Sequence, residues 1–119
     1  MRILILEDDP FIALDLQWIV ENDGHEVVGS FNSVFDAQEH LQDDFDYALL
    51  DVDVIGGKSF TIAGELLLRR IPFAFVSASQ QSELPPHLSS VCFIPKPFEE
   101  KTIRRFIGLS SIDAPRLTI

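Results

Sequence analysis

The stretch that decides the fold is residues 3–10, which read ILILEDDP. Four consecutive apolar residues are typical of a strand that is buried on both faces of a parallel sheet. The run ends abruptly in three acidic residues, and Pro10 suits the first turn of a helix. We therefore predict a buried strand, a loop that carries Glu7 and Asp8, and a helix directly after it.

The same alternation repeats along the rest of the chain. Short apolar runs predict strands at residues 3–6, 25–30, 47–50, 73–76 and 91–94. Apolar residues at helical spacing predict helices after Pro10, after Ser33, after Gly57 and around Ile103. Such an order indicates an α/β fold: a doubly wound, five-stranded parallel sheet with the flavodoxin-like strand order 2-1-3-4-5.

The connection between the fourth and fifth strands differs from the others. Its large apolar residues are Leu84 and Leu88, and two prolines fall between them. Proline at position 86 removes a helical hydrogen bond and clashes with the preceding turn. We therefore expect the helix between these strands to be short or absent, with at most one turn near residues 80–83 or after Pro86.

Length and charge limit the classes of protein that the chain can represent. It has 119 residues, which suits one domain at residues 1–109, with residues 110–119 as a tail or linker stub. The net charge of −10 disfavours direct binding to nucleic acid or to an anionic membrane. The single cysteine, Cys92, lies in an apolar run and is predicted to be a small core residue. Its inability to form an internal disulfide suits a reducing, cytoplasmic location.

Polar residues whose side chains can bind ligands or react follow four of the predicted strands. These are Glu7 and Asp8 after the first, Asp51 after the third, Ser77 after the fourth and Lys96 after the fifth. The carboxyl ends of parallel strands share one edge of the sheet, where ligands bind in such folds. Each residue alone is more often a solvated loop or cap residue, but the set together indicates a site.

The chemistry of these residue types indicates phosphoryl transfer. Crowded carboxylates repel one another, and a hard cation such as Mg²⁺ relieves the repulsion. Asp51 can then act as a nucleophile on phosphorus. The Lys96 ammonium and the Ser77 hydroxyl can each neutralise or bind one phosphoryl oxygen.

Four stretches together resemble response-regulator receiver domains of bacterial two-component systems. They are ILILEDDP at 3–10, LLD at 49–51, FVSA at 75–78 and PKPF at 95–98, and the resemblance covers residues 2 to about 109. It implies a site with Mg²⁺ or Mn²⁺ held by Glu7, Asp8, Asp51 and the backbone carbonyl of Asp53. It also implies Asp51 as phosphoacceptor, Lys96 and Ser77 as phosphoryl-binding residues, Ser77 and Phe93 as switch residues, and a cis Lys96–Pro97 peptide bond.

The resemblance also implies partners and a mode of action. The phosphodonor would be a histidine kinase or a phosphotransfer protein, and the chain would act as a monomer or weak dimer in a phosphorelay. Any enzymatic activity would be limited to self-phosphorylation and self-dephosphorylation. The sequence is similar to a subgroup that is paired with HWE-type kinases and has a reduced fourth helix. In this setting we expect residues 78–90 to be a mobile signalling surface that phosphorylation orders.

The sequence departs from the usual receiver pattern at two places, and two other classes of protein remain as alternatives. The loop after Asp51 lacks the proline that many receivers carry, and Asp53 places an acidic side chain where many carry a neutral one. The first alternative is a phosphatase of the haloacid-dehalogenase type, which also uses an Asp-x-Asp motif. That family places the motif on its first strand, whereas here Glu7 and Asp8 come first. The second alternative is a receiver-like binding module that never takes up phosphate.

Overall fold

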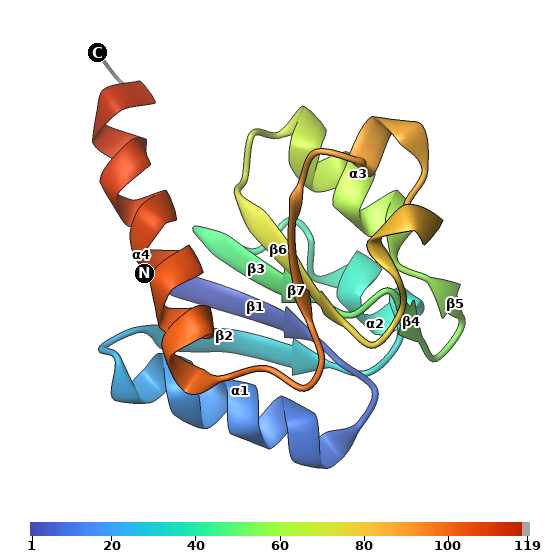
Figure 1. Ribbon diagram of the computed structural model, residues 1–119, viewed down its shortest axis with the longest axis horizontal. Coiled ribbons are helices and arrows are strands. Elements are labelled where there is room, and N and C mark those ends of the chain that lie inside the picture. Colours follow the sequence, from blue (N-terminus) through green and yellow to red (C-terminus); the bar gives the residue numbers. More distant parts are fainter. Residues whose placement is uncertain (118–119) are drawn as a thin grey trace.

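The computed structural model describes residues 1–117 and contains one five-stranded sheet in which every strand pair is parallel. Its strands are β1 (Arg2–Leu6), β2 (Glu26–Phe31), β3 (Tyr47–Leu50), β6 (Phe73–Ser77) and β7 (Cys92–Pro95). They lie side by side in the order β2-β1-β3-β6-β7 (Figure 1). Counted along the chain, this is the order 2-1-3-4-5, so the predicted fold class is confirmed.

Helices cover both faces of the sheet. They are α1 (Pro10–Asn22), α2 (Val34–Glu39), α3 (Phe60–Leu68) and α4 (Glu100–Leu117). Buried side chains of α1 and α4 join one apolar cluster, and those of α2 and α3 join another. The sheet therefore separates two cores, with α1 and α4 on one face and α2 and α3 on the other. None of the helices in the described part of the chain is long and apolar enough to span a membrane.

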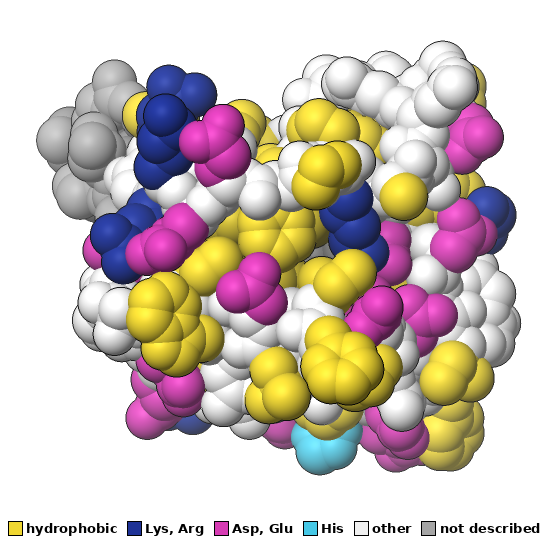
Figure 2. Space-filling view, turned by 60° about the horizontal axis from the view of Figure 1, so that its bottom comes forward, with side chains coloured by type: hydrophobic (Ala, Val, Ile, Leu, Met, Phe, Trp, Pro, Cys, Tyr) yellow, Lys and Arg dark blue, Asp and Glu magenta, His cyan; other side chains and the backbone are white. Residues whose placement is uncertain are grey.

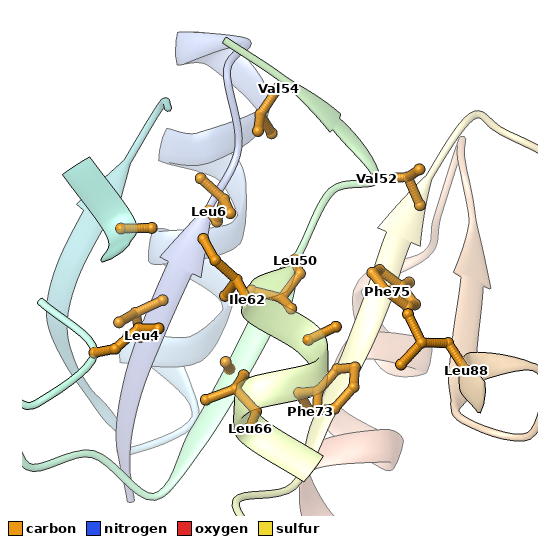
Figure 3. Packing of buried hydrophobic residues seen from close by; sticks show 14 of the residues in the cluster. Leu4, Leu6, Leu50, Val52, Val54, Ile62, Leu66, Phe73, Phe75 and Leu88 are labelled. Atoms are coloured by element: carbon orange, nitrogen blue, oxygen red, sulfur yellow. The ribbon is translucent and has the colours of Figure 1, made fainter. Parts of the chain in front are cut away.

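The interior strand β1 contributes side chains to both cores, because side chains alternate between the faces of a strand. Ile3 and Ile5 pack in the cluster of α1 and α4, whereas Leu4 and Leu6 pack in the cluster of α2 and α3. Figure 3 shows the second cluster, where Leu4 and Leu6 of β1 and Phe75 of β6 surround the buried face of α3. This two-sided burial explains why the apolar run at residues 3–6 is continuous.

Two polar side chains cap helices where the sequence indicated helix starts. The Asp9 carboxylate accepts hydrogen bonds from the backbone N–H groups of Phe11 and Ile12 at the start of α1. The Ser33 hydroxyl accepts a hydrogen bond of 3.1 Å from the N–H of Asp36 at the start of α2. Each cap satisfies donors that the first turn of a helix leaves without a partner.

Replacing Ser33 with alanine should lower the free energy of unfolding by about 1 kcal/mol, because the capping bond to Asp36 is lost. Urea denaturation followed by circular dichroism measures the change. Ser82→Ala is the control, since Ser82 is exposed, and it should stay within about 0.5 kcal/mol of wild type. Equal stabilities of the two variants would contradict the role of Ser33.

The connection between β6 and β7 contains no α-helix, as predicted. It holds two single 3₁₀ turns, η1 (Gln81–Glu83) and η2 (Pro86–Leu88). Leu84 and Leu88 are nevertheless buried, and both belong to the core cluster beneath α3. The segment is therefore anchored by two leucines, although the prolines prevent a continuous helix. Its mobility and its response to phosphorylation stay predictions.

Three features differ from the sequence-based expectations. A short antiparallel hairpin, β4 (Asp53–Val54) with β5 (Gly57–Lys58), occupies the loop after Asp51. Gly56 in its turn and Gly57 at the start of β5 have φ angles of +92° and +127°, which favour glycine. Cys92 is exposed and not a core residue, because β7 is an edge strand and Ile94 is its one buried residue.

The third difference concerns the C-terminal segment. Helix α4 continues to Leu117, so residues 110–117 of the predicted tail are helical. Residues 118–119 lie outside the described part of the chain. Whether this helical extension acts as a linker stays a prediction.

Candidate functional site

The carboxyl edge of the sheet brings together the polar residues that the sequence singled out. Glu7 follows β1, Asp51 follows β3, Ser77 ends β6 and Lys96 follows β7. Glu7, Asp51 and Ser77 are 2%, 7% and 1% exposed, although polar side chains are rarely so buried without a partner. Burial at this edge therefore points to a built site and not to solvated loop ends.

Lys96 lies between two of the carboxylates. Its Nζ atom is 2.6 Å from Oε1 of Glu7 and 3.0 Å from Oδ2 of Asp51. The backbone holds the lysine there, because the Lys96 N–H donates to the Ser77 carbonyl at 2.9 Å. The Lys96–Pro97 peptide bond is cis, as predicted.

Three acidic side chains form a cluster suited to a cation. Ligand oxygens of Glu7, Asp8 and Asp51 all lie within 4.8 Å of one another. Oε1 of Glu7 is buried and ion-paired with Lys96, yet no described donor approaches it in good hydrogen-bond geometry. An oxygen-rich cluster with spare acceptor capacity fits a hard divalent cation such as Mg²⁺ or Mn²⁺.

Charge and burial shift the ionisation of this cluster. Burial raises the pKa of Glu7 to about 7, and the neighbouring Asp51 carboxylate adds to the rise. Burial alone would lower the pKa of Lys96, but its contacts with Glu7 and Asp51 outweigh burial and raise that pKa. The ionised form of Glu7 is therefore disfavoured in this cluster, and a bound cation would favour it.

The backbone around Asp51 fixes the orientation of its carboxylate. Oδ1 accepts a hydrogen bond of 2.7 Å from the Val52 N–H, and the Asp51 N–H donates to the Leu6 carbonyl at 2.8 Å. The Ser59 hydroxyl donates to the Asp51 carbonyl from a fully buried position. Sequence reasoning missed Ser59, because a serine directly before an apolar helix usually indicates a helix cap. In the structure the Ser59 side chain makes no capping bond.

The remaining predicted residues surround this centre. Ser77 is buried, and its hydroxyl accepts a hydrogen bond of 3.2 Å from the Ser79 N–H. Phe93 is partly buried, with its ring centre 6.4 Å from that of Phe75. The Asp53 side chain contacts Lys58 and Ser79, whose hydrogen bonds lower the pKa of that carboxyl. The switch roles and the metal contact of the Asp53 carbonyl stay predictions.

Comparisons with known proteins agree with this geometry. The chain is 31% identical over 112 residues to the phyllosphere-induced regulator PhyR of Methylorubrum extorquens, and the alignment covers 90% of the chain. It is 30% identical to SdrG of Sphingomonas melonis, with a TM-score of 0.81 and coverage of 93% and 96% of the two chains. It is 25% identical to the PhyR response regulator REC domain of Erythrobacter litoralis, with a TM-score of 0.82 and coverage of 93% and 89%. No family model matches the chain.

A doubly wound sheet with clustered carboxylates and a lysine at its carboxyl edge defines a signalling receiver. The chain belongs to the receiver domains of response regulators. It spans 42% of the length of the Methylorubrum regulator, so it corresponds to less than half of that protein. The family excludes the haloacid-dehalogenase alternative, whereas pairing with HWE-type kinases stays a prediction.

Proposed function

We propose that this receiver accepts a phosphoryl group on Asp51 in a Mg²⁺- or Mn²⁺-dependent reaction. The donor would be the phosphohistidine of a histidine kinase or a phosphotransfer protein. The observation that carries the proposal is the position of the Asp51 carboxylate. It lies 3.0 Å from Lys96 Nζ and within 4.8 Å of ligand oxygens of Glu7 and Asp8.

The chain's own residues have separate roles in the transfer. One carboxylate oxygen of Asp51 attacks phosphorus, and the bond from phosphorus to the donor nitrogen breaks as the new oxygen–phosphorus bond forms. The Lys96 ammonium moves from the carboxylates to one phosphoryl oxygen, and the Ser77 hydroxyl donates to another. A cation bound by Glu7, Asp8, Asp51 and the Asp53 carbonyl would neutralise charge on the phosphoryl oxygens. Any activity of its own is limited to self-phosphorylation and self-dephosphorylation.

The surface supports signalling through protein contacts. Helix α1 presents three large apolar residues at helical spacing, Phe11, Leu14 and Trp18, which are 81%, 64% and 55% exposed. Figure 2 shows apolar side chains gathered over α1, with acidic side chains spread around them. An exposed apolar stripe of this kind marks a protein-binding surface, and the acidic surroundings disfavour nucleic acid.

Mass spectrometry after incubation with acetyl phosphate and Mg²⁺ tests the proposal. Wild type should gain about 80 Da, the increment of one phosphoryl group on a carboxylate. Asp51→Asn should gain nothing, because the amide is a poor nucleophile, whereas the exposed Asp44→Asn control should be labelled like wild type. Labelling of Asp51→Asn would sink the assignment. An unlabelled wild type would favour a receiver-like module that never takes up phosphate.

A further inference from the structure

A chain of polar contacts leads from the site to the β4–β5 hairpin. The Ser77 hydroxyl accepts a hydrogen bond of 3.2 Å from the Ser79 N–H. The Ser79 hydroxyl donates to Oδ2 of Asp53 at 2.8 Å, and Oδ1 of Asp53 is ion-paired with Lys58. Ser79 therefore contacts the buried hydroxyl of β6 through its backbone and the hairpin through its side chain.

The hairpin is in turn attached to the segment between β2 and α2. Asp53 and Lys58 face each other across the two strands, which places their side chains on one face of the hairpin. The Ile55 N–H donates to the Asn32 carbonyl at 3.1 Å, and the Ile55 carbonyl accepts from Val34 at 2.9 Å. The Ile55 side chain is 55% exposed, so a shift of the hairpin changes the molecular surface.

The contacts of the Asp53 carboxylate are weak, so they are better suited to transmitting a change from the site to the hairpin than to stabilising the fold. The side chains of Lys58 and Asp53 are 52% and 55% exposed, and an ion pair that is so exposed contributes little to stability. Contacts of this size rearrange easily when the groups around them change charge. A phosphoryl group on Asp51 would add negative charge two residues from Asp53 and would draw the Ser77 hydroxyl toward its oxygens. Phosphorylation would then displace Ser77 at one end of this series of contacts and Asp53 at the other.

We propose that Ser79 is a positioning residue that couples the Ser77 hydroxyl to the β4–β5 hairpin through the Asp53 carboxylate. The inference rests on the proposed phosphorylation of Asp51. Phosphorylation sensed at Ser77 changes the hairpin at Ile55 because Ser79 links the two. Without the Ser79 hydroxyl, Asp51 is still phosphorylated, but the hairpin no longer follows Ser77.

Amide hydrogen exchange tests this coupling in four proteins: wild type, Ser79→Ala, Ser79→Thr and Ser82→Ala. Each is treated with acetyl phosphate and Mg²⁺, and mass spectrometry verifies the phosphoryl increment. In wild type the exchange rate of the Ile55 amide should change roughly 2- to 30-fold on phosphorylation, as expected for coupling through a contact network. Ser79→Ala should be phosphorylated to the same extent but should show a change below about twofold.

The other two variants separate the hydroxyl from a general effect of substitution in this loop. Ser79→Thr keeps a hydroxyl and should retain the response. Ser82→Ala removes a hydroxyl that contacts Gln80 and should respond like wild type. A full Ile55 response in phosphorylated Ser79→Ala, or none in phosphorylated wild type, would overturn the coupling alone. A wild type without the mass increment would overturn the proposed function and the coupling with it.

Discussion

Replacing Asp8 with alanine should lower the affinity for Mg²⁺ by roughly 100-fold or more. Asp8 is the exposed member of the acidic cluster, and its ligand oxygen lies within 4.8 Å of those of Glu7 and Asp51. Removing a carboxylate ligand should cost at least as much affinity as the loss of an outer-shell partner, which is worth about 10- to 100-fold. Phosphorylation by acetyl phosphate should fall in parallel, because the phosphoryl charge is no longer neutralised.

Isothermal titration calorimetry with Mg²⁺ measures this loss directly. Because Asp8 is exposed, the variant should fold, which circular dichroism verifies. Asp44→Ala, also exposed but remote from the cluster, is the matched control and should bind Mg²⁺ like wild type. Unchanged Mg²⁺ affinity in Asp8→Ala would place the cation site elsewhere.

Phe75→Ala should destabilise the fold by about 3–5 kcal/mol, because it leaves a cavity at the centre of the core. Phe75 is fully buried in β6, and its ring contacts three other aromatic rings. The ring centres lie 5.6 Å from Phe73, 6.3 Å from Phe60 and 6.4 Å from Phe93. Edge-to-face packing of such rings adds stability beyond burial alone.

The midpoint of urea denaturation should therefore fall while the denaturant slope stays the same. Phe35→Ala is the control, because Phe35 is 70% exposed, and it should change stability by less than about 0.5 kcal/mol. A Phe75→Ala protein as stable as the control would mean that the packing of the Phe75 ring does not stabilise the core.

Much of the fold followed from local patterns in the chain. Continuous apolar runs such as residues 3–6 belong to strands buried on both faces, and the alternation of strands and helices leaves few topologies. The ends of the strands then located Glu7, Asp51 and Lys96 at one edge, and the structure brings all three into contact. Prolines 85 and 86 likewise indicated the missing helix, because proline acts within its own segment.

Other features depend on contacts between distant segments and had no local signal. Cys92 was predicted to be buried because its neighbours in the sequence are apolar. Its exposure depends instead on the position of β7 at the edge of the sheet. The bond from Ser59 to the Asp51 carbonyl likewise requires the hairpin to fold back beside the site.

By itself the sequence determined the class of fold, the edge at which the site lies and the residue types that it contains. These depend on hydrophobic periodicity and on the handedness of connections, both of which act along the chain. The tertiary structure decided that the Lys96 ammonium contacts both Glu7 and Asp51. It also decided that Ser79 and Lys58 both bind the Asp53 carboxylate. Hydrogen bonds and ion pairs require atoms within about 3–4 Å of each other, and packing alone brings residues 53 and 79 so close.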